Sequence, residues 1–202
     1  MDVNTKVNLS GLILDNPVIP ASGTYGFGKE YVDFYDINIL GSISIKGTTV
    51  QRRKGNPQPR IAECYSGLIN SVGLENPGME NVIQKELKDL EKIYRKPVIA
   101  NISGFSVEEY VTLAREMDKV DNVGIIEVNI SCPNVDHGGL AFGTNADNVR
   151  ELTKKIKEVT TKPVYMKLSP NVTDIKEIAR AAEEGGADGI SLINTLMGMR
   201  ID

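Results

Sequence analysis

Short apolar segments that end in a polar or charged residue recur along the chain, and amphipathic segments separate them. We predict six strands from this pattern, at 16–22, 41–46, 97–103, 124–131, 162–169 and 189–195. A strand that is apolar along most of its length is buried on both faces, as in a parallel sheet covered by helices. The repeated strand–helix units therefore predict an α/β fold with a parallel sheet.

Two architectures have this order of elements. A doubly wound sheet that binds a dinucleotide usually carries the motif G-x-G-x-x-G after an early strand. In this sequence Gly23, Gly26 and Gly28 have a different spacing and open no long helix. The (β/α)8 TIM barrel fits better, because barrel enzymes place their functional residues at the carboxyl ends of the strands. The predicted ends carry Ser22, Lys46, Asn101, Asn129 with Cys132, Lys167 and Asn194.

The length does not suffice for a whole barrel. A complete barrel has eight strands and typically about 250 residues, whereas this sequence has 202 residues. We therefore expect a single barrel domain over residues 1–202 that holds about six of the eight β/α units and is incomplete at its C-terminus. The chain would then be truncated, or the ordered part of a longer one.

The remaining elements follow from periodicity and from turn signals. We predict a hairpin at 7–14 and helices at 29–35, 80–94 and 147–160, with two more that begin at Ser106 and at Thr173 or Asp174. The segment 48–77 reads as long and irregular, with proline-containing turns. A loop of this length in a compact domain is usually functional.

Composition excludes several classes of protein. The formal net charge of -4 argues against a nucleic-acid-binding surface, and the basic cluster Arg52, Arg53, Lys54 and Arg60 reads as a solvated hairpin. No apolar run reaches the roughly 20 residues of a membrane span, and the N-terminus has no signal-peptide pattern. Two cysteines and one histidine argue against a disulfide framework and against a protein metal site. We expect a protein of the reducing cytoplasm.

Cys132 follows the fourth predicted strand, and Pro133 ends that strand because it has no N–H to donate. A thiol at a strand end can act as a base or a nucleophile if its surroundings favour the thiolate. A free cysteine can equally be a small buried apolar residue. Ser131 is the alternative base, but a hydroxyl is harder to deprotonate.

Lys46 and Lys167 end strands that are otherwise apolar. A buried ammonium group costs free energy unless it meets an anion or hydrogen-bond acceptors. Two such groups at one barrel mouth indicate an anionic ligand, or a cofactor that becomes anionic. The alternative is a pair of lysines with buried stems and solvated charges.

Four asparagines lie in or near predicted strand ends, at Asn70, Asn101, Asn129 and Asn194. An amide offers a donor and an acceptor together, which suits a flat ring that bears alternating C=O and N–H groups. Each of them can instead be a turn or capping residue.

At these residues the sequence resembles class 1 dihydroorotate dehydrogenase. The matching segments occur in family order over the whole chain, at 16–28, 44–49, 55–60, 68–78, 127–134, 167–170 and 194–195. Within the class the chain is more similar to the catalytic subunit of the NAD-linked, two-subunit subgroup (type 1B), because of the segments 21–28 and 194–200.

The resemblance implies a flavin-binding barrel that oxidises dihydroorotate to orotate in pyrimidine (UMP) biosynthesis, with FMN as cofactor. Cys132 would be the base that takes the proton from C5, while a hydride leaves C6 for the flavin. Lys167 would lie at the N1–C2=O edge of the flavin, where negative charge develops.

The resemblance also implies two sets of contacts. The flavin would be bound by Ser22, Lys46, Gly47, Asn101, Asn129, Lys167 and Ile193. The substrate would be bound by Lys46, Asn70, Ser71, Val72, Gly73, Leu74, Asn129, Asn194 and Thr195.

In the NAD-linked subgroup a partner subunit carries FAD and a [2Fe–2S] cluster. The resemblance therefore implies such an electron-transfer partner, with a homodimer of catalytic subunits in a heterotetramer. The seventh and eighth strands, which would carry the grip on the FMN phosphate, are absent from the sequence. We therefore expect these 202 residues alone to bind FMN poorly.

Two other functions remain open. The chain can be another flavin barrel that acts on a pyrimidine, such as a dihydropyrimidine dehydrogenase domain or a dihydrouridine synthase. It can also be an inactive fragment or scaffold that needs a missing C-terminus. The segment 70–74, which suits a carboxylate, favours orotate over uracil.

Overall fold

The computed structural model describes residues 3–131 and 142–201. At its centre a parallel sheet contains the four strands β5 (Val98–Ile102), β6 (Val123–Asn129), β7 (Val164–Lys167) and β8 (Gly189–Ser191), in chain order. The α-helices α4 (Val107–Asp118), α5 (Ala146–Lys157) and α6 (Ile175–Glu184) lie in the three successive connections between these strands. The α/β fold with a parallel sheet is therefore confirmed.

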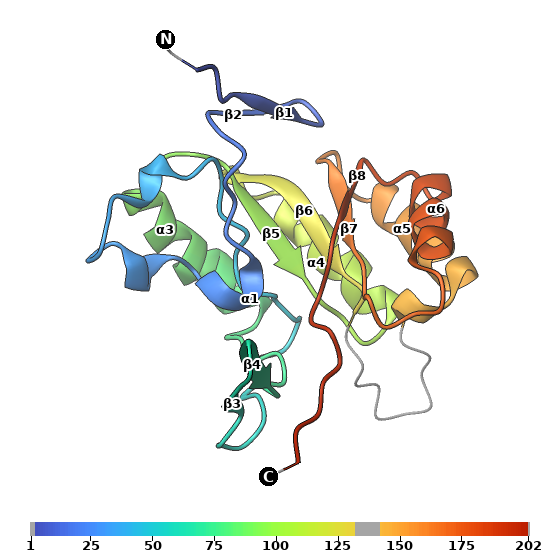
Figure 1. Cartoon of the computed structure of the whole chain (residues 1–202). Helices are drawn as coiled ribbons and strands as arrows, with labels where there is room; N and C mark the ends of the chain where they lie inside the picture. The colour runs from blue at the N-terminus through green and yellow to red at the C-terminus, as the bar shows by residue number, and fades with distance from the viewer. Residues whose placement is uncertain (1–2, 132–141, 202) are drawn as a thin grey trace.

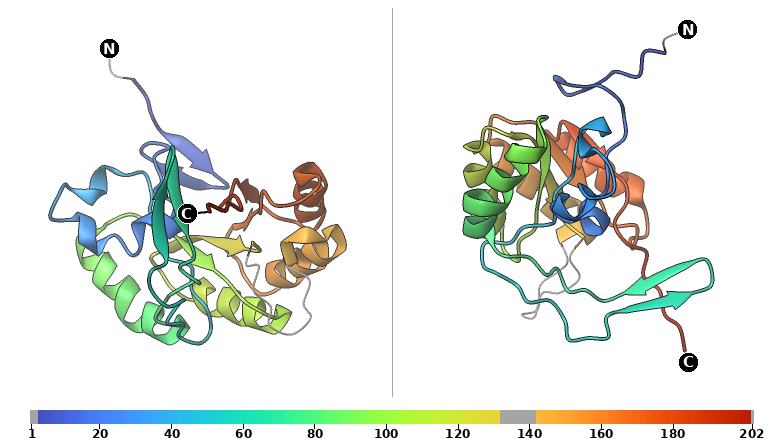
Figure 2. Two further views of the ribbon diagram at one scale, coloured as in Figure 1. Left: turned by 60° about the horizontal axis from the view of Figure 1, so that its bottom comes forward. Right: turned by 90° about the vertical axis from the view of Figure 1, so that its left-hand side faces the viewer.

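The helices lie along the outside of a curved sheet, as Figure 2 shows in the view from the bottom of Figure 1. The arrangement is that of part of a (β/α) barrel, and the sheet does not close on itself. The core fills the layer between the strands and the helices. Its fully buried side chains include Ala100, Ile126, Val128 and Met166 of the strands and Leu113, Met117, Leu152, Ile156 and Ala182 of the helices.

The first two predicted strands are present only as irregular extended segments. In the second, the Ile45 amide donates to the Ile99 carbonyl over 3.0 Å, and the Ile99 amide donates to the Ile43 carbonyl over 2.9 Å. This segment therefore lies along β5, joined to it by isolated bridges.

The first predicted strand, 16–22, was wrong as a regular strand. Its Val18 and Pro20 carbonyls accept from the amides of Gly41 and Ser44, at 3.0 and 3.3 Å. Proline at 17 and 20 has no N–H, so the segment cannot complete a ladder. The segment ends early, because Ser22 already begins the short helix α1 (Ser22–Tyr25).

The segment 48–77 contains a hairpin that follows the basic cluster, and sequence reasoning missed this position. Strands β3 (Ile61–Cys64) and β4 (Gly67–Asn70) pair in antiparallel register, and Figure 2 shows them protruding from the body of the molecule. Their connecting residues Tyr65 and Ser66 contain none of the Asn-Gly or Asp-Gly signals that mark a tight hairpin.

The predicted helix at 80–94 is confirmed, with an interruption. It begins as α2 (Met79–Asn81), passes through a π-helical stretch (Val82–Glu86) and ends as α3 (Leu87–Ile93).

The N-terminal hairpin is confirmed as β1 (Val7–Leu9) and β2 (Leu12–Leu14). The predicted helix at 29–35 was wrong, since only a short 3-10 turn forms at Lys29–Tyr31. Another such turn, Ile37–Ile39, precedes the second extended segment.

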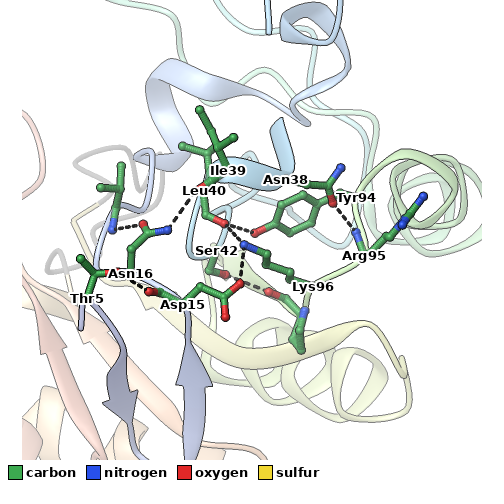
Figure 3. Close-up of polar contacts among 12 residues, drawn as sticks. Thr5, Asp15, Asn16, Asn38, Ile39, Leu40, Ser42, Tyr94, Arg95 and Lys96 are labelled. Atoms are coloured by element: carbon green, nitrogen blue, oxygen red, sulfur yellow. Dashed lines mark hydrogen bonds and ion pairs between the residues drawn. The ribbon is translucent and has the colours of Figure 1, made fainter. Parts of the chain in front are cut away.

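A polar network joins the N-terminal ends of the first strands, on the side of the sheet away from the predicted site (Figure 3). The Lys96 ammonium donates to the Leu40 carbonyl over 2.8 Å and pairs with the Asp15 carboxylate at 2.9 Å. The Asn16 side chain donates to the Ile39 carbonyl over 2.9 Å. This network ties the N-terminal hairpin to the sheet, and the hydrogen bond from Lys96 holds the pKa of Asp15 below its usual range.

Gly41 marks the closest approach of the first segment to the second. A Cβ atom at this position would lie 1.9 Å from the Asn16 carbonyl oxygen, which is backbone and has no room to move aside. We expect Gly41→Ala to lower the free energy of unfolding by about 1–3 kcal/mol, the usual cost of overpacking. Chemical denaturation measures this loss.

Gly67→Ala is the matched control, because a Cβ there would meet nothing within 4 Å. We expect it to leave the stability within about 0.5 kcal/mol of the wild type. Equal losses in the two variants would contradict the close packing of 16–22 against 41–46.

Candidate active site

The polar residues predicted at the strand ends lie on one edge of the sheet. Asn101 and Asn129 are at the ends of β5 and β6, Lys167 is the last residue of β7, and Lys46 extends from the segment that runs along β5. The register places Asn129 opposite Lys167. The hairpin β3–β4 and the C-terminal segment lie on this same side of the sheet (Figure 1).

Glu127 occupies the centre of this edge, and sequence reasoning missed it. Its side chain comes from β6, is 6% exposed, and accepts through Oε2 from Ser44 Oγ at 3.0 Å and from Asn101 Nδ2 at 2.5 Å. The Lys167 ammonium lies 3.9 Å from the same oxygen. The sequence feature that could have identified Glu127 is a single acidic residue within the apolar run 125–128. A carboxylate buried in such a run needs donors around it, so it points to a polar site.

Asn129 and Asn194, both predicted site residues, form a second pair at the same edge. The Asn194 amide nitrogen donates to Asn129 Oδ1 over 3.0 Å, and the Ser131 amide donates to the same oxygen over 3.1 Å. The Tyr110 hydroxyl donates to the Asn129 carbonyl over 2.7 Å. Both the backbone and the side chain of Asn129 are therefore held in place.

Lys46 is a half-buried cation at the rim of the site. Burial lowers the pKa of its ammonium group; the nearby Glu75 carboxylate opposes this effect and the Arg60 guanidinium adds to it. Within the part of the chain that the structure describes, its Nζ forms no hydrogen bond or ion pair. An anion beside Lys46 would therefore be stabilised by it.

Gly47 lets two side chains approach the strand ends closely. A Cβ atom there would lie 2.8 Å from Asn101 Oδ1 and 3.1 Å from a Leu74 methyl group. Asn101 Oδ1 and Ser103 Oγ are both buried and have no hydrogen-bond partner among the described atoms. Such groups cost free energy, so they fit a ligand that brings N–H and O–H groups into this region.

The segment 70–74 reaches the site only through its last residues. Gly73 and Leu74 have left-handed backbone angles (φ +74° and +58°), which turn the chain toward Gly47. The Asn56 amide donates to the Val72 carbonyl over 3.0 Å, and the Asn56 side chain donates to the Ser71 carbonyl over 2.7 Å.

The structure does not bring every predicted residue together. Asn70 and Ser71 are exposed at the base of the hairpin, and Ile193 and Thr195 are exposed on the C-terminal segment. Ser22 is buried at the start of α1. Cys132, the predicted base, lies outside the described residues.

The model of the dihydroorotate dehydrogenase family matches residues 4–202. The chain belongs to the dihydroorotate dehydrogenase family. It is 57% identical over 197 residues to the catalytic subunit of dihydroorotate dehydrogenase B (NAD(+)) of Bacillus cytotoxicus. It is 56% identical over 197 residues to the corresponding subunits of Bacillus cereus and Bacillus anthracis. These identities confirm the predicted resemblance to the NAD-linked subgroup.

The matches cover 98% of this chain and 63% of each relative. The chain thus spans less than two thirds of the length of the curated relatives that it matches. The fold is also similar to that of DHODH from Eimeria tenella, solved in complex with ferulenol, with a TM-score of 0.76. That comparison has 20% sequence identity and covers 98% of this chain and 61% of the other. It supports the fold alone.

The described residues contain neither a metal-binding cluster nor a membrane-spanning helix. Within 3–131 and 142–201, no group of three or more His, Cys, Asp or Glu side chains is placed to hold a metal ion. Over the same ranges, no helix has the length and apolar character needed to cross a membrane.

The lowered pKa of Lys46 makes a prediction for the free protein. Burying the charged form of Lys46 lowers the free energy of unfolding by its full amount at pH values below the folded-state pKa. This loss disappears as the pH rises toward about 10.4, the ordinary pKa of lysine. We expect Lys46→Met to be more stable than the wild type near neutral pH, with a gain that shrinks in alkaline solution. Denaturation at several pH values measures this difference.

Lys154→Met is the control, because its side chain is largely exposed and its ammonium group pairs with Glu151 at 3.3 Å. We expect a change within about 0.5 kcal/mol that does not vary over the same pH range. A loss of stability in Lys46→Met at neutral pH would show that Lys46 has a stabilising partner.

Proposed function

We propose that the protein catalyses the FMN-dependent oxidation of dihydroorotate to orotate in pyrimidine (UMP) biosynthesis. The observation that carries this proposal is the convergence of two lysines and three asparagine amides on the Glu127 edge of the sheet. The relatives named dihydroorotate dehydrogenase B support it, since they are more than half identical over nearly the whole chain.

The residues present fit FMN. The buried acceptor Asn101 Oδ1 and the buried Ser103 hydroxyl lack partners among the described atoms, and the Lys167 ammonium lies 3.9 Å from Glu127, the carboxylate that binds the Asn101 amide. FMN, when bound, supplies a hydride acceptor whose pyrimidine edge becomes negatively charged. We propose that it is held by Ser22, Lys46, Gly47, Asn101, Asn129, Lys167 and Ile193, within a single flavin-binding barrel domain of which residues 1–202 supply about six of the eight β/α units.

Lys167 acts in this proposal as an electrostatic stabiliser. Its ammonium group is largely buried, with 12% of the side chain exposed, so its field is screened less than that of a surface lysine. It would be aligned before the reaction by the last hydrogen bonds of β7, including the one from the Ile130 amide to the Lys167 carbonyl. Fixed charge of this kind lowers a barrier without reorganisation.

The substrate would be bound by the amides of Asn129 and Asn194 at its pyrimidine edge, and by Lys46 and the segment 70–74 at its carboxylate. The complete proposed set is Lys46, Asn70, Ser71, Val72, Gly73, Leu74, Asn129, Asn194 and Thr195. Binding through several directed groups would hold the C5–C6 bond in one orientation. Such positioning can supply a large part of the reduction in the activation free energy.

Cys132 is the proposed base that takes the proton from C5. The preceding residue, Ser131, is anchored: its amide donates to Asn129 Oδ1, and its hydroxyl donates to the Lys167 carbonyl over 3.3 Å. The chain therefore enters Cys132 from a fixed point beside two other proposed site residues. A thiolate whose pKa is near the working pH is an efficient general base.

We further propose that electrons pass to NAD through a partner subunit with FAD and a [2Fe–2S] cluster. The relatives are named as the catalytic subunit of an NAD(+) enzyme, which supports a second subunit. A homodimer of catalytic subunits within a heterotetramer, located in the cytoplasm, completes the proposal.

Anaerobic mixing of the FMN-loaded protein with dihydroorotate tests this function. We expect the flavin absorbance to bleach with dihydroorotate and not with dihydrouracil, because only the former has the carboxylate. Bleaching by dihydrouracil alone would favour another pyrimidine-specific flavin enzyme. No bleaching by either compound would contradict the proposal.

Cys132→Ser tests the base. We expect the bleaching rate near neutral pH to fall by about 10²–10⁴-fold, the usual worth of general base catalysis. Cys64→Ser is the control, since Cys64 lies half-buried on the protruding hairpin. An unchanged rate in Cys132→Ser would contradict the assignment of the base.

A further inference from the structure

Glu127 has no part in the reaction as proposed so far. Among the described residues that are buried, it is the one with a charged side chain. The free-energy cost of burying a carboxylate is high, and chains rarely do so without a partner. Its position among the proposed flavin ligands therefore calls for a reason.

We propose that Glu127 is a positioning residue for the flavin site. Its carboxylate orients the Asn101 amide and balances the charge of Lys167, and in this way sets how readily the bound flavin is reduced. The part that concerns the flavin rests on the proposed function. The part that concerns Asn101 and Lys167 stands on the geometry of the protein alone.

The orientation of Asn101 follows from hydrogen-bond chemistry. A carboxylate only accepts, so it selects the NH₂ end of the amide, at 2.5 Å. The other end, Oδ1, is then turned toward Gly47, where a Cβ would come within 2.8 Å of it. Glu127 thus presents an unpartnered acceptor toward the proposed ligand.

The contact with Lys167 has a different character. At 3.9 Å the ammonium nitrogen and Oε2 are close enough to attract one another but too far apart for a hydrogen bond. The charge of Lys167 is therefore balanced, while its hydrogen atoms are not committed to Glu127. A ligand atom that gains negative charge beside Lys167 competes with Glu127 for the same cation.

This competition predicts the direction of a measurable effect. In Glu127→Gln the negative charge is gone, so Lys167 acts fully on the flavin. We expect the midpoint potential of the bound flavin to become more positive. A tenfold change in the equilibrium constant for reduction corresponds to about 30 mV for a two-electron couple.

Redox titration of the FMN-loaded full-length protein tests this with three variants. Glu127→Gln should shift the potential upward, and Glu127→Asp, which keeps the charge on a shorter side chain, should shift it upward by less. Glu86→Gln is the matched control, because it removes a partly buried carboxylate that pairs with Lys29 at 2.8 Å, outside the proposed site. It should leave the potential unchanged. A potential that is unchanged or lower in Glu127→Gln would overturn the inference.

A second measurement needs no flavin. Without the Glu127 carboxylate, the Lys167 side chain loses its counter-ion at 3.9 Å, so we expect Lys167 of Glu127→Gln to be acetylated several-fold faster by an N-hydroxysuccinimide ester at neutral pH. Peptide mass spectrometry reports this rate for each lysine, with Lys29 as the internal reference. An unchanged rate would overturn the inference about Lys167.

The two measurements separate this inference from the proposed function. If dihydroorotate does not reduce the FMN-loaded wild-type protein, the proposed function fails, and the acetylation rate still decides whether Glu127 controls Lys167. If Glu127→Gln does not fold, the comparison moves to Glu127→Asp, whose shorter side chain should give a smaller shift of the same sign. No shift in a folded Glu127→Asp protein would then count against the inference.

Discussion

A carboxylate buried at the end of a parallel sheet costs free energy unless donors or cations surround it, and Glu127 obtains two donors and one cation from three separate segments of the chain. Ser44 comes from the extended segment beside β5, Asn101 from β5 and Lys167 from β7. A single acid on β6 therefore links its two neighbours in the sheet and the segment beyond. The same contacts leave Asn101 Oδ1 without a partner, so the group that organises the edge also prepares it for a ligand.

The two ends of the sheet divide structure and function between them. At the N-terminal ends, Lys96 donates to the Leu40 carbonyl and pairs with the Asp15 carboxylate, and Asn16 donates to the Ile39 carbonyl, which ties the first segments to β5. At the carboxyl ends the polar side chains contact one another and retain unpartnered groups. Barrel enzymes separate stability and catalysis in this way, and the site proposed for this chain follows the same division.

The regular part of the fold was predictable because periodicity reports burial. The strands β5, β6 and β7 are apolar runs bounded by turn residues, and α4 begins at Ser106, whose hydroxyl caps the Glu109 amide at 3.2 Å. The irregular course of segment 16–22 was not predicted, because its apolar residues match the pattern of a strand. Its two prolines prevent a regular ladder. The hairpin β3–β4 was missed because its turn residues carry no strong signal.

The site was predictable in part. Polar residues at strand ends predicted Lys46, Asn101, Asn129, Lys167 and Asn194 together, because parallel strands bring their carboxyl ends to one edge. Glu127 was missed because it lies two positions before the end of β6, whereas the prediction used only the residues at strand ends. The exposure of Asn70 and Ser71 depends on the direction of a protruding hairpin, and no local pattern fixes that direction.

Hydrogen–deuterium exchange with and without FMN and orotate tests most directly whether the Glu127 edge is the binding site. We predict added protection at 44–48, 70–76, 100–103 and 127–131, with little change in α5 and α6. Protection confined to those outer helices, or none at the strand ends while ligand binding is verified by absorbance, would contradict the assignment of this edge as the active site.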